Sequence, residues 1–231
     1  MIAEKLLCKF PSLDRRSFCV GSIAPDCNVE NEDWTSFTPS REITHWMSSG
    51  RKSFNDCERY YTEYMLPRKA SCNESELSFL LGYYAHLAAD AEFARFVRDA
   101  KRLTASRERI KSVPALAKAS EGMPESWESV KLLLGKKQIF SDINTIEAEY
   151  LENSPSSAYL TEILPLKSFP EYMEFLPKGA IVRKISVMGY VPEKKTDKYS
   201  FLAISRSEYM TYIDNCVSLA YPVIDEILKK S

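Results

Sequence analysis

The sequence predicts an all-α protein, and three observations support that fold class. Glycine makes up only 7 of the 231 residues, about half its usual share, and valine, a residue typical of strands, is scarce. Helix-capping patterns precede several long stretches rich in Leu, Ala, Phe and Tyr. The chain is also long enough, with 45% hydrophobic residues, to bury a sizeable core. We therefore expect a multi-helix bundle.

Capping signals predict where the helices begin. Ser53 and Asp56 form a capping-box pattern with Asp in place of Glu, which opens a helix. This helix is expected over 54–66, up to the next proline. Asn73 caps a longer helix, expected over 74–103. Weaker signals predict further helices from Pro124 to Gly135, over 141–152, 156–164 and 170–176, and from the capping box at Ser205 to about 229, with a kink at Pro222.

Two regions do not follow the helical pattern. Residues 1–50 have mixed polarity and several prolines, and are expected to be irregular. Residues 181–191 and 198–204 are partly alternating and β-branched, which predicts a small C-terminal β-hairpin. A helix over 181–191 stays open as the alternative.

No segment has the Gly, Ser and Pro content of a linker, so a single domain over 1–231 is expected. Its helical core would cover 15–165, and residues 166–231 would form a C-terminal helical extension.

The composition argues against several functional classes. The net charge of −1 and the pI near 6.2 give no basic excess for gripping nucleic acid. No glycine-rich phosphate loop occurs, and no apolar stretch is long enough for a transmembrane segment. The first residues carry charges that would break a signal-peptide core. The six cysteines form no C-x-x-C pair, so free thiols and a cytoplasmic location are expected.

Both histidines have neighbours that suit a metal site. His86 and Asp90 are four residues apart on the long predicted helix, so they share one face. That face is otherwise apolar, and a buried carboxylate there needs compensation, which either a metal ion or a hydrogen bond to the imidazole supplies. Asp26 follows a proline at a predicted turn, and His45 lies nineteen residues later. Taken singly, Asp26 and each histidine are more typical of a structural role, and the spacing of His86 and Asp90 favours neither a metal site nor a hydrogen bond in the core.

Taken together, three motifs resemble the zinc-dependent phospholipase C family, which is related to the S1/P1 nucleases. The motifs are Gly-Ser-Ile-Ala-Pro-Asp (21–26), Thr-His-Trp (44–46) and Gly-Tyr-Tyr-Ala-His-Leu-Ala-Ala-Asp (82–90), and the resemblance covers about residues 17–105. It implies an all-helical fold and a metal site. Carried over position by position, it makes Asp26, His45, His86 and Asp90 the ligands of one zinc ion.

The sequence also departs from that family. Secreted members hold three metals with additional histidines, whereas Phe96 stands where one of those histidines is expected and no later H-x-x-x-E motif occurs. The N-terminal Trp ligand is absent as well, because the chain begins with Met1. A second metal would need carboxylates such as Asp56 or Glu92. However, Asp56 is expected to cap a helix, and Glu92 would point away from the ligand face.

The resemblance implies a metal-dependent hydrolase, a phospholipase C-like phosphodiesterase that cleaves a small phosphoester with metal-activated water. Asp26 would be both ligand and general base, because a carboxylate on a loop can shift to accept a proton. Two carboxylates and two imidazoles suit Zn²⁺, and also Fe²⁺ or Mn²⁺. Arg41, Lys52 and Arg95 are candidate phosphate-binding cations.

Two alternatives stay open. The chain could be a non-catalytic metal-binding relative that binds a ligand or an unidentified partner protein, which the missing cluster histidines favour. It could also be an HD-type metal phosphohydrolase, which is likewise helical with two His and two Asp. That class needs an adjacent His-Asp pair, and neither His45 nor His86 is followed by Asp.

Overall fold

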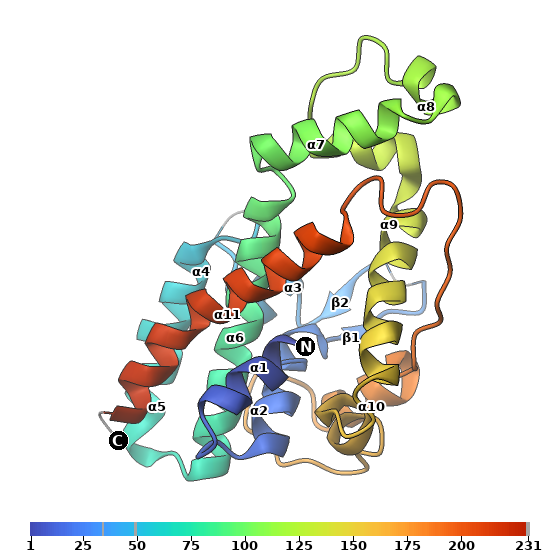
Figure 1. Cartoon of the computed structure of the whole chain (residues 1–231). Helices are drawn as coiled ribbons and strands as arrows, with labels where there is room; N and C mark the ends of the chain where they lie inside the picture. Colours follow the sequence, from blue (N-terminus) through green and yellow to red (C-terminus); the bar gives the residue numbers. More distant parts are fainter. Residues whose placement is uncertain (34, 49, 230–231) are drawn as a thin grey trace. The chain divides into compact units, whose positions relative to one another are not determined.

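The computed structural model describes residues 1–33, 35–48 and 50–229, and it confirms the all-α fold class (Figure 1). Contacts divide this part of the chain into two compact units. The first unit comprises 1–92, 155–190 and 215–229, and the second comprises 93–154 and 191–214. The single domain expected from the sequence stays a prediction. The candidate ligands all belong to the first unit.

The first unit begins with short helices and is built around the long helix α6. Its helical elements are α1 (Ile2–Lys9), α2 (Arg15–Gly21), the 3₁₀ turn η1 (Ala24–Asp26), α3 (Arg41–Thr44), α4 (Phe54–Arg59), the π-helical η2 (Tyr60–Met65), α5 (Leu66–Arg68), η3 (Lys69–Ser71), most of α6 (Glu74–Phe96), η4 (Tyr159–Ile163), α10 (Ala180–Met188) and the end of α11 (Arg206–Lys229). One antiparallel ladder pairs β1 (Val29–Glu30) with β2 (Phe37–Thr38). The second unit contains α7 (Ala100–Lys111), α8 (Pro114–Ala119) and α9 (Trp127–Glu152).

Two glycines let α2 and α6 touch backbone to backbone. A Cβ atom built on Gly21 would lie 2.0 Å from the carbonyl oxygen of Phe79, and one on Gly82 would lie 2.0 Å from that of Phe18. No side chain fits at such a separation, so the glycines in two of the three motifs are required by packing. The close approach brings the end of α2 against the turn of α6 that carries His86.

Gly82→Ala is therefore expected to destabilise the protein by about 3 kcal/mol, because one helix backbone must move away from the other. Urea unfolding followed by circular dichroism measures this difference. Gly50→Ala is the matched control in the same unit, since a Cβ there meets no atom within 4 Å. Equal stability of the two variants would contradict the argument.

The helix ends differ from the sequence prediction in several places. The helix over 54–66 continues past the proline at 67, because the π-helical turn η2 carries it into α5. The helix over 74–103 is two helices: α6 ends at Phe96, and Asp99 caps α7 by accepting a hydrogen bond from the Arg102 backbone N–H. α9 begins at Trp127 and consists of two helices that meet at a kink at Gly135, so the expected stop is confirmed by the non-helical φ of 78° there, whereas the second helix begins before the expected residue 141.

The predicted C-terminal hairpin is wrong. Residues 180–188 form α10, and Ala180, Ile181 and Ile185 are its buried residues. Their spacing follows a helical face, so burial at that period outweighs the β-branched composition. Residues 198–204 form turns, and no helix forms over 170–176. Residues 1–50 are also more helical than expected, because Asp14 caps α2 by accepting from the Ser17 N–H.

The closing helix agrees with its predicted capping box. The Ser205 N–H donates to Glu208, the Glu208 N–H donates back to the Ser205 hydroxyl, and α11 continues through Pro222. The six cysteines are free thiols, as expected. Within the described residues, no helix has the length and apolar character needed to span a bilayer.

Candidate metal centre

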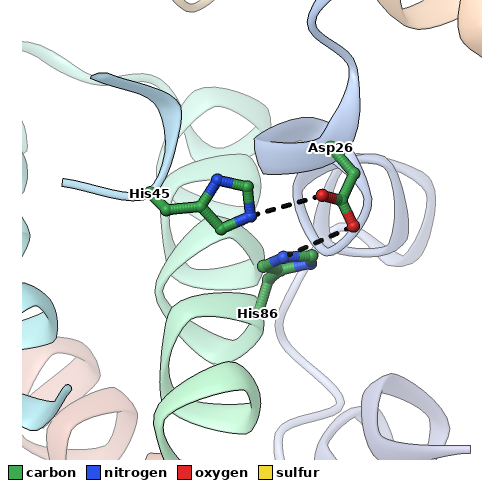
Figure 2. A group of neighbouring side chains, drawn as sticks. All are labelled: Asp26, His45 and His86. Carbon is green, nitrogen blue, oxygen red and sulfur yellow. Dashed lines mark ion pairs between the residues drawn. The ribbon is translucent and has the colours of Figure 1, made fainter. Parts of the chain in front are cut away.

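Three segments of the first unit bring the candidate ligands together. Asp26 ends the 3₁₀ turn that follows α2, and His45 caps the C-terminus of α3. His86 and Asp90 lie one turn apart on α6, as their spacing predicts. Figure 2 shows Asp26 between the two imidazoles, with one carboxylate oxygen toward each. The four residues that the sequence singles out therefore converge.

The distances between these side chains are short enough for them to share one metal ion. His45 Nε2 lies 3.3 Å from Asp26 Oδ1 and 3.4 Å from Asp90 Oδ2. His86 Nε2 lies 3.8 Å from Asp26 Oδ2 and 3.2 Å from Asp90 Oδ2. One ligand atom each from Asp26, His45 and His86 can be chosen so that all lie within 4.8 Å of one another. Metal–ligand bonds of about 2.0–2.2 Å to one central ion require a grouping of this size.

The other ring nitrogens fix the orientation of both imidazoles. His86 Nδ1 lies 2.9 Å from the carbonyl oxygen of Ser22, so it must carry the proton and donate it. His45 Nδ1 lies 2.9 Å from the Thr44 hydroxyl. Both Nε2 atoms are buried and have no hydrogen-bond partner among the described residues. Buried nitrogens with a free lone pair, oriented by a second interaction, are typical of histidines that bind metal.

The charges of the group are strongly coupled. Burial opposes ionisation of Asp26 and Asp90, but the nearby imidazoles and Lys52 outweigh it, so the pKa of each carboxyl is below its ordinary value. Burial also disfavours the charged form of His86, yet Asp90 and Asp26 raise the pKa of this imidazole. Burial dominates at His45 and lowers its pKa. These shifts keep both carboxylates ionised, favour the neutral form of His45 and favour the protonated form of His86.

Metal affinity is therefore expected to fall on acidification through the protonation of His86. Below its raised pKa, His86 is cationic and its Nε2 has no lone pair, whereas Asp26 and Asp90 stay ionised and the lowered pKa of His45 keeps that imidazole neutral to a lower pH than His86. One proton then competes with one metal ion, so the apparent Kd rises about tenfold per pH unit below that pKa. Competition with a chelator between about pH 5 and 8 measures the slope. A Kd that does not change over this range would contradict the assignment.

Two of the three predicted cations lie at the site. Lys52 forms an ion pair with Asp90. Arg41 lies 3.4 Å from the carboxylate of Asp26. Arg95 belongs to the second unit. The carboxylates of the candidate ligand set are thus already paired with cations in this structure.

The two additional carboxylates are engaged elsewhere. Asp56 is 2% exposed and accepts four hydrogen bonds, from the backbone N–H and hydroxyl of Ser48 and of Ser53. Its predicted capping role is confirmed by the capping box at the start of α4. Glu92 accepts a hydrogen bond from Asn215. Neither carboxylate joins the candidate ligand group in the part of the chain that is described.

A cavity of about 440 Å³ opens beside the ligands within the first unit. Asp26 and His86 contribute to its wall, together with Arg41 and Lys184. The other lining residues are Ser22, Ile23, Cys27, Asn28, Phe37, Tyr159, Ile163, Ile185, Met188 and Gly189. Most of these were not singled out from the sequence, because they carry no spacing signal and come from segments up to about 160 residues apart. A metal ion held by Asp26 and His86 would therefore lie at the wall of a pocket that has cationic and apolar surfaces.

The comparison with known families agrees with this geometry. Residues 3–92 match the family model described as zinc dependent phospholipase C, which confirms the resemblance over that stretch, less than half of the chain. The stretch contains Asp26, His45, His86 and Asp90. The family is zinc-dependent and the donor set suits a divalent metal ion. No curated protein and no solved structure matches the chain.

Proposed function

We propose that the protein is a zinc-dependent hydrolase of a small phosphoester, and that Asp26, His45, His86 and Asp90 are the metal ligands. The observation that carries this proposal is the pair of buried Nε2 atoms of His45 and His86, which have no hydrogen-bond partner among the described residues and face the carboxylates of Asp26 and Asp90. Asp26 and His86 also line the pocket. A divalent ion bound there supplies an acidified water and positive charge against the phosphoryl oxygens. The family match supports the same reaction class.

The two carboxylates have different surroundings, which suggests different roles. Asp90 lies on the long helix α6 and is held by Lys52, so it is a fixed ligand. Asp26 ends a short turn, lines the pocket, and has a side chain that is 52% exposed. Its exposed position at the pocket wall would let this carboxylate reach a metal-bound water and accept its proton.

Arg41 is positioned to bind the scissile phosphate. Its guanidinium lies within 3.4 Å of Asp26 and also lines the pocket. A guanidinium can bind two phosphoryl oxygens in parallel, which orients the phosphorus for in-line attack. This placement supports Arg41 over Arg95 as the phosphate-binding cation predicted from the sequence.

The experiment is zinc analysis of the purified protein, followed by hydrolysis of bis(p-nitrophenyl) phosphate. We expect one zinc ion per chain and a measurable rate that a chelator removes. Asp26→Asn should lower kcat by at least about 100-fold, the lower end of the contribution of a general base. Asp56→Asn is the control, because that carboxylate caps α4 and bonds to Ser48 but does not join the candidate ligand group.

The non-catalytic alternative has one observation in its favour. The ion pairs of Lys52 with Asp90 and of Arg41 with Asp26 compensate both carboxylates without a metal. Bound zinc with no turnover of any phosphoester would support this alternative and overturn the proposed hydrolase.

A further inference from the structure

We infer that Lys184 and Asn28 form an anion-binding subsite in the pocket, and that the substrate carries a second anionic group besides its scissile phosphate. The inference rests on the proposed function for the identity of the scissile group. The subsite itself rests on the pocket, the burial of Asn28 and the charges of the lining residues.

Asn28 provides the first observation. Its residue is 3% exposed, it lines the pocket, and its side-chain Nδ2 has no hydrogen-bond partner among the described residues. A buried amide donor without a partner destabilises the fold, because it has lost its hydrogen bonds to water. A ligand that accepts this hydrogen bond would remove the cost, so the position favours an acceptor-rich group.

Lys184 provides the second observation. Its side chain is 13% exposed, lines the same pocket, and places its ammonium 5.7 Å from the ring centre of Phe37. Phe37 pairs with Glu30 in the two-stranded ladder that begins next to Asn28. Asn28 thus directly precedes the ladder that Lys184 contacts through Phe37. Both side chains are hydrogen-bond donors and both line the pocket.

The carboxylate beside Lys184 does not cancel its charge at the pocket. Glu30 is held by two bonds of 3.0 and 2.9 Å from Arg183, whereas its distance to Lys184 is 3.4 Å. Glu30 is not a lining residue, and its side chain is 4% exposed. Two cations and one carboxylate give this group a net positive charge. Among the described lining residues, Asp26 is the sole acid, and it belongs to the candidate metal site.

The pocket therefore has two places that attract negative charge. One is the candidate metal site with Arg41, which would take the scissile phosphate. The other is Lys184 with Asn28, which would take a carboxylate or a second phosphate. Apolar side chains such as Ile163, Ile185 and Met188 complete the pocket wall. A substrate with a cationic substituent would meet Lys184 unfavourably, because like charges repel in a partly buried pocket.

Binding of non-hydrolysable probes tests the subsite without requiring turnover. Calorimetry would compare 3-phosphonopropionate with propylphosphonate, which lacks the carboxylate, on zinc-loaded protein. We expect wild type to bind 3-phosphonopropionate at least tenfold more tightly, and Lys184→Met to remove that preference. Lys167→Met, which changes an exposed lysine of the same unit outside the pocket, should keep it.

Asn28→Asp is the second variant, because it leaves the pair of Lys184 with Glu30 intact and adds an anion to the subsite. It should also remove the preference. Equal affinity of wild type for the two probes, or a preference that survives in both variants, would overturn the subsite.

Turnover separates this inference from the proposed function. Wild type should hydrolyse 2-carboxyethyl p-nitrophenyl phosphate with a kcat/KM at least tenfold above that of the 2-(trimethylammonio)ethyl ester, with the difference mainly in KM. A binding preference without hydrolysis of either ester would refute the hydrolase and leave the subsite standing. Hydrolysis without a preference for the anionic ester would refute the subsite alone.

Discussion

His86→Ala is expected to abolish stoichiometric zinc binding. The imidazole lies on α6 and its Nδ1 donates a hydrogen bond to the Ser22 carbonyl. The ring is therefore already oriented, so binding a metal through its buried Nε2 costs little side-chain entropy. The close contact of Gly21 and Gly82 with the facing helix backbones fixes that geometry. Residues that merely orient a metal-bound histidine contribute about 10–100-fold to affinity. Loss of the ligand itself should therefore weaken zinc binding by at least about 100-fold.

Zinc content by mass spectrometry and affinity by chelator competition measure this effect, with circular dichroism to show that the variant is folded. Asp56→Asn serves as the matched control. It changes a buried carboxylate of the same unit and should lower stability by roughly 1–2 kcal/mol through weaker capping, but keep one zinc ion per chain. Undiminished zinc in His86→Ala would exclude His86 as a ligand.

The convergence of the four candidate ligands could be predicted because each lies in a short motif that resembles the family. His86 and Asp90 share a helix face by spacing alone, and Asp26 and His45 were identified by the order of the motifs along the chain. The role of Asp56 was also predictable, since a capping box needs only the residues from Ser53 to Asp56. Helix spacing thus supplied the pair of His86 and Asp90, and the family resemblance supplied Asp26 and His45.

The pocket beside the ligands could not be predicted in the same way. Lys184 and Ile185 lie on α10, which has a β-branched composition and was expected to form a strand. Their burial depends on packing within the first unit rather than on local propensity. Asn28 gives no signal in the sequence at all, because a missing hydrogen bond is a property of the fold. Long-range contacts, not motifs, therefore determine what the pocket accepts.

Lys52→Met is expected to tighten zinc binding by about 10–100-fold. Lys52 forms an ion pair with Asp90, so its ammonium competes with a metal ion for the same carboxylate. If the ammonium of Lys52 lies about 5 Å from the metal, each unit of positive charge on the metal is repelled by roughly 3 kcal/mol at an effective dielectric constant near 20. Because the Lys52 side chain is 24% exposed, solvent screening reduces this to roughly 1–3 kcal/mol. Methionine keeps the length of the side chain and removes the charge, so Asp90 becomes fully available to the metal.

The measurement is the zinc Kd at neutral pH by competition with a chelator, compared among wild type, Lys52→Met and Lys167→Met. Lys167 belongs to the same unit but lies outside the pocket and the ligand group, so its variant should keep the wild-type Kd. Weaker binding in Lys52→Met would show that the ammonium supports the site rather than competing with the metal. The ammonium would then have to move away from Asp90 on metal binding without cost, although the two side chains form an ion pair and are only 24% and 26% exposed.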